Sequence, residues 1–156
     1  MAALSIEDAF ASALDLFPHI DSLKDKQKDC IEALLKKKDV LGLLPTGFGK
    51  SLIYQLFPKI HLLVKGGERC HVIVVSALKA ITEEQVIELN ELGIVAAAIS
   101  ESQKTDEEIL EGKYEVVFGS AEMWLRRNWI SKLKTSKLKN NVELLVVDEA
   151  HVSQSW

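Results

Sequence analysis

The sequence predicts an α/β fold in which a mainly parallel sheet is covered by helices on both faces. Short runs rich in β-branched residues alternate along the chain with longer amphipathic segments, a pattern typical of β-α-β units. The short runs are apolar at successive positions, as expected for strands that are buried on both faces. Two of them end in residues suited to phosphate or metal binding, and ligands of parallel sheets bind at the carboxyl ends of the strands.

Length and composition indicate a single globular domain. The chain has 156 residues, of which 47% are hydrophobic and 27% charged, which excludes wholesale disorder, a collagen-like fold and a coiled coil. No apolar run approaches the roughly 18 residues that span a bilayer, and Glu7 and Asp8 argue against a signal peptide. Cys30 and Cys70 lack metal-ligand spacing and fit a reducing, intracellular compartment. The net charge of −4 does not favour nucleic-acid binding by the chain as a whole.

The first elements are expected to be two helices. Residues 5–8 form a capping-box pattern, and apolar residues then follow at helical spacing until Pro18 ends the run. A second helix is expected to start near Ser22. Gln27 shares a face of this helix with apolar residues, which is unusual for a polar side chain.

Strands and helices alternate along the rest of the chain. Apolar, β-branched runs predict the strands, and apolar residues at helical spacing predict the helices between them. The expected strands are residues 40–45, 71–76, 94–100, 115–120 and 143–148. The expected helices are residues 50–64, 78–92, 105–111 and 125–133.

The segment 44–51 reads LPTGFGKS and fits a phosphate-binding loop, except that its first position is leucine instead of glycine. Gly47 and Gly49 allow backbone N–H groups to point inward as an anion nest. A helix that begins near Lys50 adds its positive N-terminal end. Lys50 would reach the outer phosphates, and Ser51 would place a hydroxyl on Mg²⁺. The alternative is a glycine-rich turn that only joins a strand to a helix.

Two acidic residues follow the last predicted strand. Asp148 can hold Mg²⁺ through its water shell, and Glu149 can orient and deprotonate an attacking water. Taken alone, the sequence DEAH at 148–151 would also suit the start of a polar helix. Its position roughly a hundred residues after a phosphate loop favours catalysis, so Lys50 and Glu149 are the predicted catalytic residues.

These motifs resemble those of the RecQ family of superfamily two DNA helicases, over nearly the whole chain. The similar segments are LPTGFGKSLIYQ, VVSALKAITEEQV, VVFGSAEMW and DEAHVSQSW. The resemblance implies the first RecA-like domain of a P-loop NTPase motor, with ATP and Mg²⁺ as cofactors. It also implies 3′ to 5′ translocation on DNA, driven by ATP hydrolysis, in the nucleus if the organism is a eukaryote.

The resemblance assigns roles to individual residues. The ATP-binding residues would be Lys24, Gln27, Thr46, Gly47, Phe48, Gly49, Lys50 and Ser51. Ser51 and Asp148 would hold the metal, whereas His151 and Trp156 would couple nucleotide to DNA. The DNA contacts would be Ser76, Leu78, Gln85, Ser120 and Glu122.

By this resemblance, Gln27 reads the adenine edge. Lys24 stands where the family has arginine. The positive charge is kept, but the planar guanidinium group, which can make two parallel hydrogen bonds, is lost. Ile20 replaces the aromatic residue that stacks on adenine, with Phe17 and His19 nearby, so we expect weaker stacking. The alternative is a core-facing glutamine whose polar atoms are satisfied by backbone groups.

Two alanines and a basic segment bear on DNA affinity. Ala77 and Ala121 stand where the family has proline, which would leave both DNA-contact loops less preorganised. Residues 124–142 contain six basic and no acidic residues, a stretch that could add salt-dependent phosphate contacts. We favour the simpler explanation, a solvated helix face followed by a lysine-rich loop. Trp124 and Trp129 are expected to pack in the core instead of stacking on bases.

The chain is expected to be an incomplete motor. The resemblance implies one domain over residues 1–156, truncated after the DEAH box, with the second RecA-like domain and its arginine fingers missing. An arginine finger contributes about 10³–10⁵ in rate, so the chain alone should bind nucleotide better than it hydrolyses it. The full-length protein would act on single-stranded DNA and duplex junctions, away from membranes. Two alternatives stay open: an RNA helicase motor, and a truncated paralogue that only binds nucleotide or a partner.

One structural expectation concerns the middle of the sheet. By resemblance, the strand after the DEAH box is inserted between the strands at 40–44 and 144–148. We therefore expect these two strands to flank a gap about one strand wide. Unpaired backbone groups are costly, so the isolated chain should be marginally stable or prone to aggregate through its exposed edges.

Overall fold

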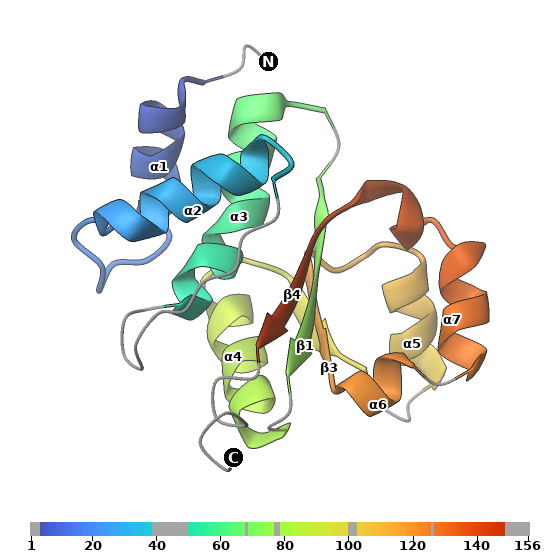
Figure 1. Cartoon of the computed structure of the whole chain (residues 1–156). Coiled ribbons are helices and arrows are strands. Elements are labelled where there is room, and N and C mark those ends of the chain that lie inside the picture. Colours follow the sequence, from blue (N-terminus) through green and yellow to red (C-terminus); the bar gives the residue numbers. More distant parts are fainter. Residues whose placement is uncertain are drawn as a thin grey trace, which may run out of the picture. The chain divides into compact units, whose positions relative to one another are not determined.

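The structure, a computed structural model, describes residues 4–38, 50–67, 69–76, 79–99, 103–125 and 127–148. The chain forms two compact units, Met1–Arg69 and Cys70–Trp156. Helices make up the regular structure described in the first unit, and a sheet with its covering helices makes up the second (Figure 1). The predicted strand at 40–45 lies outside the described residues.

The first unit contains α1 (Ile6–Leu14), α2 (Asp25–Leu35) and α3 (Lys50–Lys65). Both α1 and α2 contact α3. Ser5 caps α1 as predicted, because its hydroxyl accepts a hydrogen bond from the backbone N–H of Asp8. The buried apolar side chains of this unit include Phe10, Ile31, Leu56, Phe57 and Ile60 on the helices and Phe17 after α1.

The start of α2 differs from the prediction by three residues. The helix begins at Asp25 with Lys24 as its N-cap, whereas the sequence predicted a start near Ser22. The reason is a capping box: the side-chain oxygen of Gln27 accepts a 2.8 Å hydrogen bond from the backbone N–H of Lys24. Gln27 therefore determines where the helix begins.

In the part of the chain that the structure describes, the second unit is built on a four-stranded, all-parallel sheet. Its strands are β1 (His71–Ser76), β2 (Ala96–Ala98), β3 (Val116–Gly119) and β4 (Val142–Asp148). Their order across the sheet is β2-β3-β1-β4, and every pair is parallel. The predicted strand 71–76 is confirmed to the residue, whereas β2 is shorter than the predicted 94–100.

Helices cover both faces of this sheet, as predicted (Figure 1). The helix α4 (Lys79–Glu91) contacts β2 and β3 on one face. The other face carries α5 (Gln103–Leu110), α6 (Ala121–Trp124) and α7 (Arg127–Lys134), and a 3₁₀ turn at Leu138–Asn141 leads into β4. The fold is thus an α/β fold of RecA-like type.

The helix predicted at 125–133 is present as α7, and the short helix α6 precedes it without having been predicted. Ser120 caps α6, because its hydroxyl accepts a hydrogen bond from the N–H of Met123. Trp124 and Trp129, one on each helix, pack edge to face with ring centroids 5.6 Å apart. Both tryptophans are buried in one apolar cluster with Leu138, which confirms the prediction that they are packing residues.

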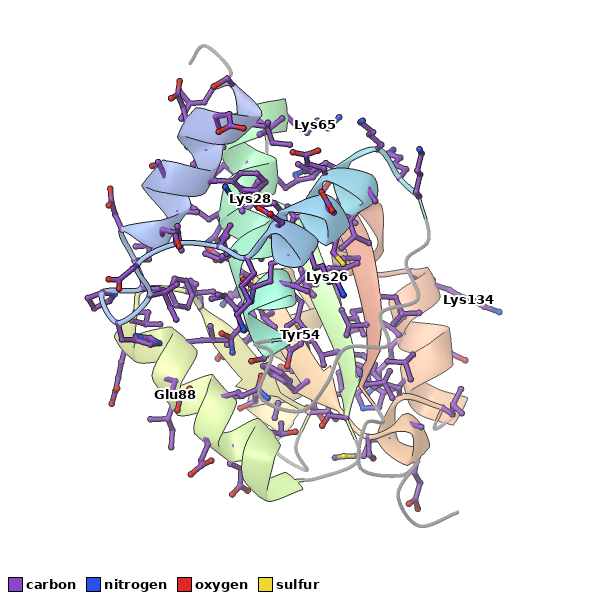
Figure 2. The ribbon with its side chains drawn as sticks, turned by 60° about the vertical axis from the view of Figure 1, so that its left-hand side comes forward. Lys26, Lys28, Tyr54, Lys65, Glu88 and Lys134 are labelled. Atoms are coloured by element: carbon purple, nitrogen blue, oxygen red, sulfur yellow. The ribbon has the colours of Figure 1, made fainter. Side chains whose placement is uncertain are left out.

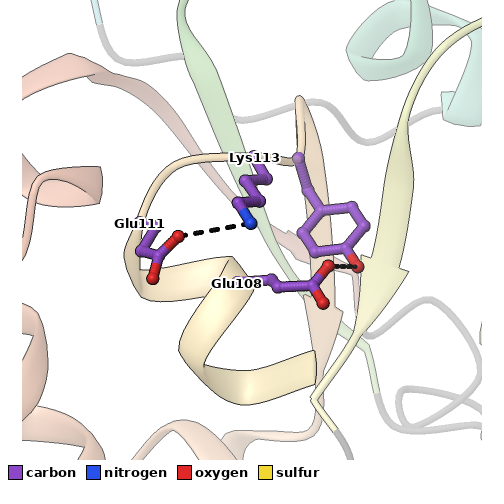
Figure 3. Close-up of polar contacts among 4 residues, drawn as sticks. Glu108, Glu111 and Lys113 are labelled. Carbon is purple, nitrogen blue, oxygen red and sulfur yellow. Dashed lines mark hydrogen bonds and ion pairs between the residues drawn. The ribbon is translucent and has the colours of Figure 1, made fainter. Parts of the chain in front are cut away.

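The turn between α5 and β3 is held by polar contacts (Figure 3). The phenol of Tyr114 donates a 3.0 Å hydrogen bond to Glu108, and burial followed by this bond raises the pKa of Tyr114. The backbone carbonyl of Tyr114 accepts a 2.6 Å hydrogen bond from Nδ1 of His71, which ties the turn to β1. The ion pair between Lys113 and Glu111 is exposed and contributes little stability.

In the part of the chain that the structure describes, none of the helices has both the length and the apolar character needed to cross a membrane.

Candidate nucleotide-binding site

The N-terminus of α3 is the element best suited to bind phosphate in the first unit. The helix begins at Lys50, as predicted, and Ser51 lies half-buried in its first turn. A helix of 16 residues presents unpaired backbone N–H groups and the positive end of its dipole at this point. The preceding Thr46, Gly47, Phe48 and Gly49 lie outside the described residues, so the loop itself stays a prediction.

In the second unit, three of the predicted site residues meet at the carboxyl edge of the sheet. Ser76 ends β1 and is the register partner of Asp148, which ends β4. On the other side of β1, Val75 is paired with Gly119, so Ser120 follows at the same edge of the sheet. This is the edge at which parallel sheets bind their ligands. The structure therefore brings together Ser76, Ser120 and Asp148 from three neighbouring strands.

The donor atoms of the predicted metal ligands suit magnesium. Mg²⁺ binds oxygen ligands and is held through one or two carboxylates together with waters and substrate phosphates. The hydroxyl of Ser51 and the carboxylate of Asp148 are both oxygen donors of this kind. Among the described residues no group of three or more His, Cys, Asp or Glu side chains could form an all-protein metal site. Ser51 and Asp148 each carry the type of oxygen donor that the predicted Mg²⁺ prefers.

The predicted adenine reader, Gln27, is buried. Its side chain is 3% exposed, and its oxygen accepts from the backbone N–H of Lys24, whose side chain is exposed. This capping contact corresponds to the alternative in which backbone groups satisfy the glutamine. Phe17 is buried too, with its ring 6.3 Å from that of His19.

Of the other predicted DNA contacts, the structure describes Glu122 on α6 and Gln85 on α4. The hydroxyl of Ser120 is used as the N-cap of α6, and Glu122 is exposed in the first turn of that helix. Gln85 lies half-buried on α4. Leu78, Glu149, His151 and Trp156 lie outside the described residues. Their roles stay predictions.

Three lysines of the basic segment lie on α7 and in the turn after it. Lys132, Lys134 and Lys137 are exposed, and Figure 2 shows Lys134 pointing away from α7. Lys132 and Lys134 lie in the last turn of the helix, where cations favourably oppose the helix dipole. These positions match the solvated helix face that we favoured for this segment.

One residue that shapes this edge was missed in the sequence. A Cβ on Gly119 would lie 2.7 Å from Nε1 of Trp124 and 3.0 Å from Cδ1 of Ile99, so only glycine fits at the end of β3 without a shift. Glycine at a strand end is a known sign of close approach by another group. No local sequence pattern identifies that group, because the contact between Gly119 and Trp124 forms only when α6 packs against the sheet.

The all-parallel sheet, its helices on both faces and the polar residues at its carboxyl edge define the class of RecA-like α/β domains. The chain belongs to the DEAD/DEAH box helicase family, whose model matches residues 24–156.

Curated relatives bear the names of DNA helicases. The chain is 35% identical over 140 residues to the probable ATP-dependent DNA helicase RecS of Bacillus subtilis. It is 29% identical over 147 residues to the putative ATP-dependent DNA helicase Q1 of Caenorhabditis elegans and 33% identical over the same length to the ATP-dependent helicase SGS1 of Saccharomyces cerevisiae. These matches cover 86–88% of this chain but only 26%, 22% and 10% of the three relatives. The relatives are RecQ-type helicases, as the sequence motifs predicted.

Proposed function

We propose that the chain is the ATP-binding part of a RecQ-like DNA helicase that couples Mg-ATP hydrolysis to 3′ to 5′ translocation and strand separation. The observation that carries the proposal is the meeting of Ser76, Ser120 and Asp148 at one edge of a parallel sheet in a chain of the helicase family. The names of the relatives, which are DNA helicases, favour DNA over RNA. In this proposal the protein acts inside the cell, and in the nucleus if the organism is a eukaryote.

In this proposal the first unit binds the phosphates of ATP. The N–H groups at the start of α3 would hold phosphate oxygens, and Lys50 would add a charge-assisted contact to the outer phosphates. Ser51 would contribute one hydroxyl ligand to the metal. Magnesium bound with the nucleotide would neutralise charge that develops on the phosphates during transfer.

The second unit would supply the chemistry at the carboxyl end of β4. Asp148 would orient a water of the metal, and Glu149 would take a proton from the water that attacks the γ-phosphate. Ser76 and Ser120 would contact the nucleic acid from the ends of β1 and β3. We further propose that fast hydrolysis needs a second RecA-like domain with an arginine finger, whose typical contribution is about 10³–10⁵ in rate.

The test compares nucleic acids as activators of ATP hydrolysis by the native protein. We expect single-stranded DNA to stimulate hydrolysis more than RNA of the same sequence, and a duplex with a 3′ overhang to be unwound in preference to one with a 5′ overhang. The Lys50→Ala variant should lose the stimulated activity. Equal or greater stimulation by RNA would support an RNA helicase, and nucleotide binding without any hydrolysis would support the non-catalytic paralogue.

A further inference from the structure

One edge of the sheet is formed by β2, which has β3 on one side and, among the described residues, no strand on the other. Val95 and Ile99, on either side of β2, are both hydrogen-bonded to β3: the carbonyl of Val95 accepts a 2.7 Å bond, and the N–H of Ile99 donates a 2.8 Å bond. Successive residues of a strand direct their backbone groups to opposite edges. Ala96 and Ala98 therefore direct theirs away from β3.

Asn90, near the end of α4, takes the place of a neighbouring strand at Ala96. Its side-chain oxygen accepts a 2.9 Å hydrogen bond from the N–H of Ala96, and its amide nitrogen donates a 3.1 Å bond to the carbonyl of the same residue. A carboxamide offers both a donor and an acceptor, as a peptide group does. One side chain thus occupies both outward backbone groups of Ala96.

The end of α4 holds Asn90 in this position. Gly93 has a positive φ of 90°, and the N–H of Ile94 donates a 2.9 Å hydrogen bond to the carbonyl of Leu89, which is the pattern of a glycine C-cap. Leu89 and Ile94 are both buried, so the cap is fixed to the core. The chain reverses within these few residues, and Asn90 comes to lie beside a strand residue only six positions further on.

Without Asn90, the edge of β2 would be open to another chain. Outward N–H and C=O groups on an edge strand are a template for an added strand, and proteins commonly protect them with charged side chains or proline. The strand Ala96–Ala98 consists of three alanines and has neither. Val95 is 37% exposed, and Asn90 is exposed too, so a partner can reach this edge from solvent. A second copy of the chain offers the same groups, and two identical edges can pair about a two-fold axis.

We propose that Asn90 is an autoinhibitory contact at the edge of the sheet: its carboxamide occupies the outward groups of Ala96 and keeps β2 from pairing with β2 of a second copy. The inference is independent of the proposed function, because none of the candidate site residues takes part in it. Removal of this one side chain should convert the edge into an interface between two copies.

The first test is amide hydrogen exchange in the wild-type chain, followed by NMR at low protein concentration. The N–H of Ala96 should exchange slowly, because Asn90 holds it. The N–H of Ala98, which points to the same edge, should exchange faster. An Ala96 N–H that exchanges as fast as that of Ala98 would overturn the proposal, and this measurement does not depend on any variant being able to fold.

The second test is sedimentation of Asn90→Ala over a range of protein concentrations. Alanine is a better helix former than asparagine, so α4 should persist, which circular dichroism verifies. The N–H of Ala96 should lose its protection, the sedimenting mass should double as the concentration rises, and the N–H of Ala98 should become protected in the dimer. Glu91→Ala truncates the neighbouring exposed residue of α4. It is the matched control and should sediment as the wild type does.

Two further changes locate the interface. Every chain is also prepared with Leu145→Lys and Val147→Lys, because these side chains of β4 are 63% and 60% exposed and offer a competing surface for association. Ala98→Pro, added to Asn90→Ala, removes the other outward N–H at a position where edge strands tolerate proline, and should restore the wild-type mass. The proposal is wrong if Asn90→Ala stays monomeric after Ala96 has lost its protection, or if its association persists with Ala98→Pro.

Discussion

The indole Nε1–H of Trp124 donates a 3.3 Å hydrogen bond to the backbone carbonyl of Val74. This bond joins α6 to the central strand β1, directly beneath the edge that carries Ser76. It passes over Gly119, where a Cβ would approach the same Nε1 to 2.7 Å. The position of α6, and with it of Ser120, therefore depends on a glycine that makes room for a tryptophan.

Gly119→Ala should destabilise the protein by about 1–3 kcal/mol, the usual cost of overpacking a core. The free energy of unfolding in urea measures the effect. In a Trp124→Phe background, which removes the indole nitrogen, the same substitution should cost clearly less. An equal cost in both backgrounds would show that the indole is not the group that requires glycine.

The exposed apolar residues of β4 are expected to drive self-association. Leu145 and Val147 are 63% and 60% exposed, and β4 lies at the edge of the described sheet. Replacing both by lysine should reduce aggregation, as charges on edge strands do in natural proteins, with little change in the free energy of unfolding. Light scattering during heating measures the aggregation, and unfolding in urea measures the free energy of unfolding.

Leu144→Lys is the matched control for this experiment, because Leu144 is on the same strand but only 8% exposed. A lysine there should unfold or strongly destabilise the protein.

The strand predicted at 40–44 lies outside the described residues, so the expected gap beside β4 and the marginal stability inferred from it stay predictions. Cooperative unfolding of the monomeric chain at an ordinary midpoint would contradict the expected marginal stability.

Alkaline pH should destabilise the fold through Cys70. Burial, assisted by Glu143 and Glu115, raises the pKa of this thiol from 9.0 to about 12. The unfolded chain therefore loses the proton first, and the stability due to the protonated thiol is complete below pH 9 and is lost as pH rises toward 12. Unfolding free energies measured between pH 8 and pH 10.5 should fall more steeply in the wild type than in Cys70→Ala.

Val72→Ala is the control for the cavity that Cys70→Ala creates, because Val72 is equally buried but does not titrate. It should lower stability while keeping the alkaline slope of the wild type. If Cys70→Ala also kept that slope, the thiol would not be the group responsible.

Lys50→Ala should weaken ATP binding about ten- to over a hundredfold, since charge-assisted contacts to an anion are worth about 1.5–3 kcal/mol. Titration calorimetry measures the affinity. Lys65→Ala removes the same charge from the opposite end of α3, where Figure 2 shows its side chain, and should leave the affinity unchanged. Equal affinities in both variants and the wild type would rule out the phosphate loop.

Asp148→Asn and Glu149→Gln should separate metal binding from catalysis. The first should weaken nucleotide binding in the presence of Mg²⁺ only. The second should preserve binding and abolish ATP turnover in the native protein, because only the base that activates water is lost. Near-wild-type turnover by Glu149→Gln would show that another group takes the proton.

Local sequence signals predicted several elements closely. The start of α3 at Lys50 and the whole of β1 are confirmed, because apolar periodicity and β-branched runs act within a few residues of chain. The predicted start of α2 near Ser22 was wrong, because the helix begins at Asp25, where Gln27 accepts a hydrogen bond from the backbone N–H of Lys24. The helix predicted at 125–133 corresponds to α7, Arg127–Lys134, whereas the short helix α6, which Ser120 caps, was not predicted.

The sequence by itself determined the α/β class, the helices on both faces and the helicase family, since these follow from periodicity and short motifs. Only the tertiary structure decided the strand order β2-β3-β1-β4 and the pairing of Ser76 with Asp148. Strand order depends on hydrogen bonds between segments that lie far apart in the chain, and hydrophobic pattern does not specify which buried strand is next to which. For the same reason, the sequence predicted Ser76 and Asp148 as separate site residues, and only the pairing of β1 with β4 showed that they are neighbours.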